Sequence, residues 1–228
     1  MKKIVILTGA GMSAESGIKT FRDAGGLWEG HDVMEVASPQ GFARNPELVL
    51  NFYNQRRRQL LEVHANSAHI ALANIENSYD VNIITQNVDD LHERAGSTDV
   101  LHLHGELLKV RSTYDPNLIY NRKKDLNLGD KCENGSQLRP HIVWFGEDVP
   151  MLEKAVEITA MADILLIIGT SMQVYPAAGL VNYIKPGIPI YFIDPNPTVS
   201  EHSFQNLTII SEKASIGVKQ LIDNYLNG

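Results

Sequence analysis

The stretch Lys3–Arg22 constrains the fold more than any other part of the chain. It begins with a β-branched-rich apolar run from Ile4 to Leu7, which is typical of a strand buried on both faces. The turn Gly9-Ala10-Gly11 then lets the backbone bend tightly and approach a ligand, and Ala14 completes the pattern G-x-G-x-x-A. This pattern serves a dinucleotide pyrophosphate in some proteins and is an ordinary strand-turn-helix in others, so the remaining sequence has to decide.

Apolar strands alternate with helices along most of the 228 residues. We expect strands at 4–7, 81–85, 100–104, 141–145, 164–168 and 188–193, and helices at 45–63, 66–75, 150–161, 176–184 and 215–226. This alternation predicts an α/β fold: a Rossmann-like, mostly parallel sheet with helices on both faces. Residues 112–139 are polar with few apolar anchors and are interpreted as an inserted module.

A single catalytic domain over 1–228 is the expected organisation. Its core would comprise about 1–30, 80–110 and 140–228, with a helical insertion at about 31–79 and a smaller module at about 111–139. Four of the strands end in small or polar residues, and ligands of such sheets bind at the carboxyl ends of the strands. The four ends are Thr8-Gly9-Ala10-Gly11, Thr85-Gln86-Asn87, Gly169-Thr170-Ser171 and Asp194-Pro195-Asn196. Together they predict one nucleotide crevice.

Charge and composition exclude several classes of function. The formal net charge is -7 and the sequence pI is near 5.6, so we expect no nucleic-acid partner, and the run Arg56-Arg57-Arg58 is too short to bind one. The first apolar run ends at Leu7, short of a signal peptide, and no later run approaches a membrane span. We therefore expect a cytoplasmic protein without a membrane partner. The oligomeric state is left open, with a monomer as the working expectation.

Six motifs in a fixed order resemble those of a known family. They are GAGMSAESGIKTFR at 9–22, TQNVDDLHERAG at 85–96, LHGE at 103–106, RPHIVWFGE at 139–147, GTSMQVYPAA at 169–178 and KAS at 213–215. The chain resembles the sirtuins, the NAD-dependent protein-lysine deacylases. Two further stretches, VASPQGF at 36–42 and FYNQRRRQ at 52–59, resemble the bacterial branch that also removes acidic acyl groups such as succinyl.

The resemblance implies NAD as cofactor and assigns residues to each part of it. Gln86, Asn87 and Asp89 would line the nicotinamide and inner-ribose pocket, and Ala214 would lie near the adenine. Asp194 and Asn196 would contact ribose hydroxyls. The pyrophosphate and cofactor-binding loop would comprise Gly9, Ala10, Gly11, Ser13, Ala14, Glu15, Phe21 and Arg22, with Trp28 beyond it. The opposite side, which would hold phosphate and the adenine ribose, would comprise Gly169, Thr170 and Ser171.

The family chemistry explains why these residue types are present. Sirtuins break the bond between nicotinamide and ribose while the acyl oxygen of the substrate lysine attacks the ribose carbon to give an alkylimidate, so no protein nucleophile is needed. His104 would be the catalytic base for a ribose hydroxyl. Asn87 and Asp89 would orient the ribose and a water, or cap the helix that begins near Asp89, and we expect both roles. His102 and His92 are expected to be hydrogen-bonded structural residues.

Two residues of the predicted helix at 45–63 are expected to bind the acyl group of the substrate. Tyr53 and Arg56 are three residues apart and share a helix face, where a guanidinium and a phenol could bind the carboxylate of a succinyl group. Ala37 resembles the small residue that widens this pocket in the acidic-acyl branch. The alternative is a solvated basic face with Tyr53 packed inside. Arg57 and Arg58 are expected at the surface.

The chain departs from the family at its metal module. Sirtuins usually bind a structural zinc through four cysteines, but Ser112 stands where the first is expected and Cys132 is the single cysteine of this chain. We therefore expect no metal, and a module held by packing and hydrogen bonds or left mobile. Two alternatives to deacylation are a non-catalytic NAD or ADP-ribose-binding protein, which would not use His104, and a nicotinamide dehydrogenase. The dehydrogenase ranks last because a glycine-rich flap stands where its second strand should end in a ribose-binding acid, about 20 residues beyond the glycines.

Overall fold

The computed structural model describes residues 1–19, 27–28, 30–200 and 202–226. Phe21 and Arg22, two of the predicted cofactor contacts, lie outside these residues. A six-stranded sheet forms the centre of the fold, in the order β11-β10-β9-β1-β4-β5. All neighbouring strands in it are parallel. The strands are β1 (Lys3–Thr8), β4 (Asp80–Thr85), β5 (Val100–His102), β9 (Ile164–Ile168), β10 (Ile190–Ile193) and β11 (Leu207–Ile210).

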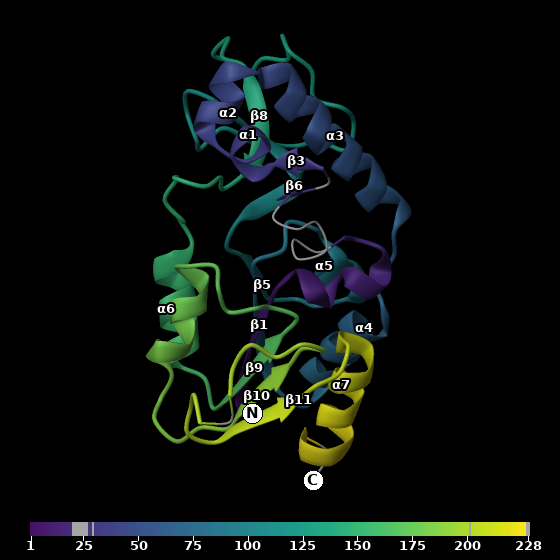
Figure 1. The fold of residues 1–228 in the computed structure, drawn as a ribbon, viewed down its shortest axis with the longest axis vertical. Coiled ribbons are helices and arrows are strands. Elements are labelled where there is room, and N and C mark those ends of the chain that lie inside the picture. The colour runs from purple at the N-terminus through teal and green to yellow at the C-terminus, as the bar shows by residue number, and fades with distance from the viewer. Residues whose placement is uncertain (20–26, 29, 201, 227–228) are drawn as a thin grey trace.

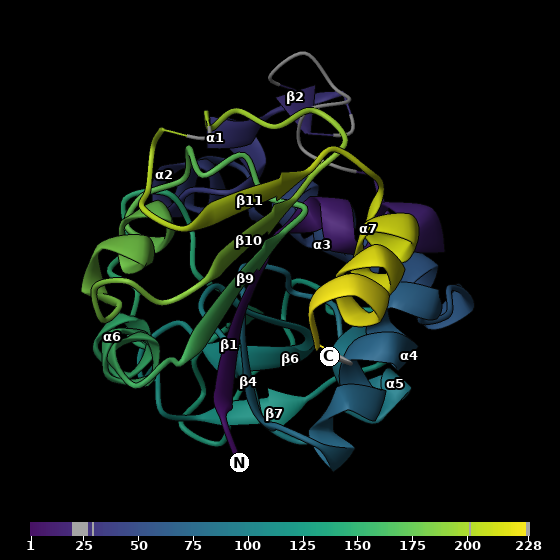
Figure 2. The same cartoon turned by 90° about the horizontal axis from the view of Figure 1, so that it is seen from below.

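Helices cover both faces of this sheet, so the predicted Rossmann-like α/β class is confirmed. Successive residues of β1 point to opposite faces, and Ile4 and Ile6 therefore pack with α4 (Ser67–Asn74) and α7 (Ala214–Leu221). Val5 and Leu7 pack on the other face with α6 (Leu152–Ala160) and the 3₁₀ segment η5 (Ala177–Tyr183). Figure 2 shows α4 and α7 on one side of the sheet and α6 on the other.

A smaller unit lies at the far end of the long axis (Figure 1). It contains the antiparallel sheet β7-β6-β8, built from β6 (Gly105–Ser112), β7 (Ile119–Asn121) and β8 (Leu138–Ile142). Three helices pack with it: α1 (Val33–Val36), α2 (Pro39–Arg44) and α3 (Pro46–Glu62). Asn45 caps α3 by accepting the amide of Leu48 at 3.1 Å. A short pair, β2 (Leu27–Trp28) and β3 (His31–Asp32), completes this unit.

Several elements differ from the sequence-based expectations. The glycine-rich turn continues as two 3₁₀ turns, η1 (Ala10–Met12) and η2 (Ala14–Ser16), instead of an α-helix. Further short segments are η4 (Ile75–Asn77), α5 (Leu91–Ala95) and the π-helical turn η6 (Ile222–Leu226). β6 and β11 were not predicted, because β6 carries a register shift that breaks its alternating pattern and β11 is a four-residue edge strand. The strand expected at 141–145 lies at 138–142 instead.

The boundaries of the two units also differ from the expected ones. β6 and β8 pair with each other in the small sheet and not in the core, while α4 packs on the large sheet and not in a helical insertion. Among the described residues, no helix has both the length and the apolar character that a bilayer crossing needs.

Candidate functional site

Three loops meet at the carboxyl ends of β1, β4 and β9. The amide of Gly9 donates to the carbonyl of Ile168 at 3.0 Å, and the amide of Gln86 donates to the carbonyl of Thr8 at 2.9 Å. The side-chain amide of Gln86 then reaches the hydroxyl of Thr170 at 3.1 Å. The structure thus brings together rim segments that the sequence placed at one edge, although the residues in contact are 77 to 159 positions apart in the chain.

The glycines of the rim are required by packing between two loops. A Cβ atom on Gly9 would lie 2.7 Å from Thr170 Cβ, and one on Gly11 would lie 2.7 Å from Gly169 Cα. Gly169 itself has a φ of +63°, and a Cβ there would lie 2.3 Å from the amide nitrogen of Met12. The pattern was interpreted as room for a phosphate, but in this structure the space beside each glycine is filled by the facing loop. Ala10 and Ala14 lie on η1 and η2, directly beyond this contact.

Ser13 is the centre of a buried polar cluster. Its hydroxyl donates to Asp89 Oδ2 at 2.9 Å and accepts from the side-chain amide of Asn87 at 3.1 Å. All three residues are at most 7% exposed. Burial raises the pKa of the Asp89 carboxyl, while the hydrogen bonds from Ser13 and the Leu91 amide work against that rise. Asp89 also accepts the Leu91 amide at 3.2 Å, a turn contact just before α5, whose N-cap is Asp90 and not the predicted Asn87 or Asp89.

His104 lies beside this cluster with a defined tautomer. Its Nδ1 is 3.1 Å from the carbonyl oxygen of Gln86, and a carbonyl only accepts, so Nδ1 carries the proton. Nε2 therefore keeps its lone pair. Burial lowers the pKa of His104 below its ordinary value, although the bond to Gln86 opposes this. A neutral imidazole with an accepting Nε2 is the form that a general base needs.

The other two histidines named from the sequence have hydrogen-bonding partners within the protein, as predicted. His92 is buried with its Nε2 3.1 Å from the hydroxyl of Thr8. His102 binds the carbonyl of Asn87 through Nδ1 at 3.1 Å and Glu93 Oε1 through Nε2 at 2.7 Å. Glu93 was not singled out from the sequence.

The predicted adenine side of the site is formed by β10 and α7. Glu15 has a structural partner here, because its carboxylate accepts the amide of Ser215 at 2.9 Å and the hydroxyl of Ser215 at 2.7 Å. Its carboxylate thereby caps α7, next to the buried Ala214. Asp194 is buried and accepts the amide of Asn196 at 2.9 Å, so these two predicted ribose contacts form one turn. Ser171 belongs to the same side through its carbonyl, which accepts the hydroxyl of Thr198 at 2.7 Å.

The residues assigned to the acyl group surround an aromatic cluster in the small unit. Tyr53 is fully buried, and its hydroxyl oxygen accepts the indole N–H of Trp144 at 2.9 Å. The guanidinium carbon of Arg56 lies 3.3 Å from the ring centroid of Phe52 and 5.6 Å from that of Trp28. Ala37 is buried in the same apolar cluster. The three predicted residues therefore lie in one region, with Tyr53 packed inside it. Trp144 was not assigned a role from the sequence.

Arg57 was expected at the surface, and that prediction is wrong. Its side chain is fully buried, donating from Nε to the carbonyl of Leu107 at 3.2 Å and from Nη1 to Asn54 Oδ1 at 2.6 Å. Burial lowers its pKa to about 10. Residue 57 is one helical turn after Tyr53, so it shares the buried face of α3. The Arg58 side chain is 57% exposed, as predicted.

The module at 112–139 does not fit the zinc that the family resemblance implies. The Cys132 thiol donates to the hydroxyl of Ser112 at 3.4 Å, and that hydroxyl also accepts the amides of Tyr114 and Asp115. Among the described residues, no group of three or more histidine, cysteine or acidic side chains could hold a metal ion. A closed tetrahedral zinc site needs four such ligands. We therefore assign no step and no structural role to a metal.

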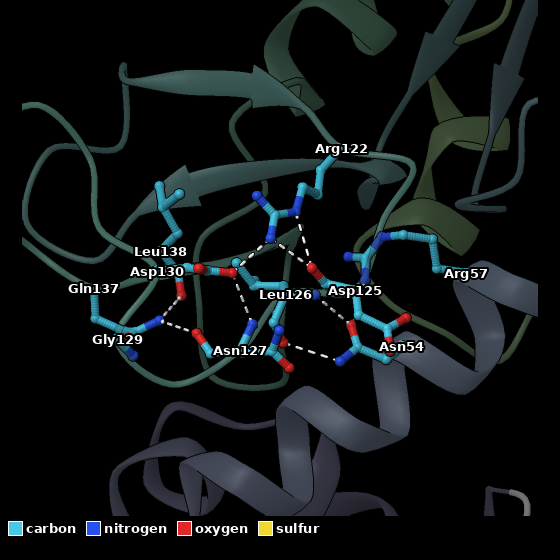
Figure 3. A network of polar contacts seen from close by, with 10 residues as sticks. All are labelled: Asn54, Arg57, Arg122, Asp125, Leu126, Asn127, Gly129, Asp130, Gln137 and Leu138. Atoms are coloured by element: carbon cyan, nitrogen blue, oxygen red, sulfur yellow. Dashed lines mark hydrogen bonds and ion pairs between the residues drawn. The ribbon is translucent and has the colours of Figure 1, made fainter.

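Hydrogen bonds and apolar packing hold this module instead (Figure 3). Arg122 donates to the carbonyl of Asp125 at 2.5 and 3.0 Å and to Asp130 Oδ2 at 2.5 Å. Gln137 binds the backbone of both Asn127 and Gly129. We call Asn54, Arg122, Asp130 and Gln137, with the backbone of 125–138, the polar clamp. The expectation that the module has few apolar anchors is also wrong. Apolar side chains of the module and its neighbours form one buried cluster: Leu50, Val110, Leu126, Cys132 and Leu138.

Within the polar clamp, Asn54 is the residue that belongs to α3. Asn54 donates to the carbonyl of Leu126 at 2.9 Å and accepts the amide of Leu126 at 2.8 Å (Figure 3). Asn54 is 5% exposed, so both bonds are shielded from water. The module is therefore tied to the helix that carries Tyr53 and Arg56.

Comparison with known proteins gives consistent matches over the whole chain. Residues 9–176 match the sequence profile of the Sir2 family. An NAD-dependent protein deacylase of Helicobacter pylori is 62% identical, covering 99% of this chain and 98% of the relative. A protein of the same description from Bacteroides thetaiotaomicron is 55% identical, with 97% of both chains covered.

Solved structures show the same likeness in three dimensions. The crystal structure of a Sir2 homologue–NAD complex superposes with a TM-score of 0.89 at 40% identity, covering 99% of this chain and 90% of the other. A Sir2 protein bound to acetylated peptide gives a TM-score of 0.78 at 28% identity, covering 96% and 92%.

Proposed function

The chain belongs to the Sir2 family, and from this membership and the geometry of the rim we infer that it is an NAD-dependent protein-lysine deacylase. The observation that carries the inference is the neutral, accepting Nε2 of His104 beside the cluster of Ser13, Asn87 and Asp89. Relatives that share 55 to 62% of their residues with this chain are NAD-dependent protein deacylases. The family, the enzyme class and the cofactor agree with what the sequence motifs predicted.

The polar groups at the rim fit NAD chemically. Hydroxyl, amide and carboxylate groups converge there from three loops, which suits a ligand rich in ribose hydroxyls and amide groups. When bound, NAD supplies the ribose carbon that receives the acyl oxygen, with nicotinamide as the group that leaves. Gln86, Asn87 and Asp89 would hold its nicotinamide end, and Thr170 and Ala214 would lie toward its adenine end.

His104 would take a proton at Nε2. Its lowered pKa keeps the ring neutral at physiological pH, so no proton has to leave before it acts. The bond from Nδ1 to Gln86 holds the ring orientation and makes Nε2 more basic as the proton arrives. Asn87 and Asp89 would orient a ribose hydroxyl and a water, while their bonds to Ser13 keep both side chains in place.

We further propose that acidic acyl groups are accepted as well as acetyl. Support comes from the side chains of Arg56, Tyr53 and Ala37, which lie in one aromatic cluster of the small unit. A guanidinium beside a phenol is suited to a succinyl carboxylate. A cytoplasmic location and a monomeric state stay predictions.

His104→Ala tests the enzyme class most directly. Incubation of the protein with NAD and an acetyl-lysine peptide should release nicotinamide, and the variant should lose about 100-fold or more of that rate, within the range that general bases contribute. The exposed residue His64 gives a matched control, and His64→Ala should keep the wild-type rate. NAD binding without nicotinamide release by the wild type would instead support the non-catalytic alternative.

A further inference from the structure

Each backbone carbonyl from Thr85 to Val88, in the segment that leads to Asp89, accepts a hydrogen bond. The carbonyl of Thr85 accepts the amide of Leu103, and that of Val88 accepts the amide of Leu107. Between them, the carbonyls of Gln86 and Asn87 accept Nδ1 of His104 and Nδ1 of His102, each at 3.1 Å. Four successive carbonyls are thus bound by β5 and β6 and the turn between them, and the middle two depend on histidine side chains.

His102 is arranged to act as an imidazolium. Its Nδ1 faces the carbonyl of Asn87 and its Nε2 faces the carboxylate of Glu93 at 2.7 Å, and both partners are acceptors. Only the doubly protonated ring can donate to both at once. The His102 side chain is 8% exposed, whereas that of its partner Glu93 is 39% exposed. β5 is an edge strand of the large sheet, and Glu93 reaches it from α5.

We propose that His102, held by Glu93, is a positioning residue for deacylation: it fixes the backbone of Asn87 so that Asn87 and Asp89 stay converged on Ser13. This inference rests on the proposed function. The Asn87 side chain donates to Ser13 across 74 residues of sequence, and Asp89 accepts from the same hydroxyl. Because both side chains follow directly from this backbone, a shift at the carbonyl of Asn87 would misplace them together.

The charge of His102 also acts on the cluster. Burial works against its protonation, but the hydrogen bond and charge of Glu93, together with the charge of Glu106, raise its pKa above the ordinary value. The resulting positive charge works against the rise in the Asp89 pKa, which burial still holds above its ordinary value. The same imidazolium thus supports both the position of Asn87 and the ionised form of Asp89.

Two substitutions at residue 102 separate the two contacts. His102→Asn places an amide nitrogen near the position of Nδ1, so it keeps a donor toward the Asn87 carbonyl and loses Glu93. His102→Gln places its amide near Nε2, so it keeps Glu93 and loses the carbonyl. We expect kcat/KM for NAD to fall about tenfold to a hundredfold in His102→Gln, the range for losing a charge-assisted hydrogen bond, and clearly less in His102→Asn.

The readouts distinguish positioning from general damage. In His102→Gln the loss should appear in kcat and in KM for NAD, whereas KM for the acyl-peptide should stay near the wild-type value. The control His64→Asn should keep wild-type kinetic constants. Equal losses of kcat/KM in the two His102 variants, or losses of kcat/KM in proportion to a drop in melting temperature, would overturn the proposal.

Calorimetric titration with NAD tests the proposal without turnover: His102→Gln should bind NAD more weakly than His102→Asn, and equal affinities would reject the inference. A wild type that binds NAD but releases no nicotinamide would instead reject the proposed function.

Discussion

Trp144 donates its indole N–H to the hydroxyl oxygen of Tyr53, with 2.9 Å between Nε1 and Oη, in a core where neither residue is more than 2% exposed. Trp144 is itself held by Glu147, whose carboxylate accepts its amide at 2.8 Å and also binds Arg139. The bond occupies an acceptor site of the phenol and leaves the phenol proton to donate. Because Tyr53 is fully buried, the proposed acid pocket requires this proton to become accessible to an acyl carboxylate.

Tyr53→Phe should therefore reduce desuccinylation selectively. We expect kcat/KM for succinyl-lysine peptide to fall about fivefold, the effect of one neutral hydrogen bond, with a smaller change for acetyl-lysine. The buried Trp144 N–H would lose its partner, so the free energy of unfolding should also fall by about 1–3 kcal/mol. Steady-state kinetics on the two peptides, together with urea unfolding, separate the two effects. An equal fall in kcat/KM for both peptides would show that Tyr53 serves packing and not acyl recognition.

Arg56→Met should have the larger effect on acyl selectivity. Losing a charge-assisted hydrogen bond to a shielded carboxylate costs about 1.5–3 kcal/mol, so kcat/KM for succinyl-lysine should fall tenfold to a hundredfold. Acetyl-lysine has no such carboxylate and should be much less affected. Arg58→Met is the matched control, because Arg58 lies on the same helix with its side chain 57% exposed, and it should change neither substrate. An Arg56→Met enzyme with unchanged preference for succinyl over acetyl would contradict the acid pocket.

The polar clamp predicts where the small unit loses stability. Asn54→Ala removes two shielded hydrogen bonds to the backbone of Leu126 and one from Arg57, and we expect a loss of about 1–3 kcal/mol in the free energy of unfolding. Arg58→Met removes a contact of 3.4 Å to Asp125 at an exposed site and should cost less than about 0.5 kcal/mol. Urea titrations of both variants test the difference, and similar midpoints would show that the clamp is not what stabilises the module.

Metal removal should leave the enzyme unchanged. Ser112 and Cys132 bond to each other at 3.4 Å, and the module around them is closed by the polar clamp. We expect purified protein to hold no stoichiometric zinc and to keep its rate after dialysis against a strong chelator. Elemental analysis and nicotinamide release before and after dialysis are the measurements. About one tightly held zinc per chain, in a closed site of the usual kind, would contradict this reading of residues 112–139.

Acid should destabilise the fold through a buried pair of histidines. Burial lowers the pKa of His69 to about 4 and that of His92 to about 3, so the unfolded chain binds protons that the folded one does not once the pH falls below about 6.5. The two histidines therefore cost no stability above that pH. Below it, each lowers the free energy of unfolding by up to about 1.4 kcal/mol per pH unit. The raised pKa of His102 offsets part of this loss.

Melting temperatures between pH 7.5 and 5 measure that slope. His69→Leu should flatten it even if the variant is less stable throughout, because one of the two buried groups no longer titrates. An unchanged slope in His69→Leu would assign the acid sensitivity to other groups.

The large sheet and its rim could be predicted from the sequence because their signals are local. A strand buried on both faces, such as Ile164–Ile168, is a continuous apolar run, and the residues that end it are adjacent in the chain. The parallel alternation then places all those ends at one edge. The short β11 and the bulged β6 have no such run, and both depend on neighbours distant in sequence.

What each polar side chain does at the site was decided by tertiary structure alone. Arg57 and Arg58 are neighbours in one basic run, yet one is fully buried against Leu107 and Asn54 while the other is largely exposed. The sequence separated His102 from His104 only through the family motif, and the fold supplies the physical difference: a carboxylate partner for the first and an accepting nitrogen for the second. Hydrogen bonds depend on distance and direction in space, and contacts that span 9 to 91 residues leave no local pattern to read.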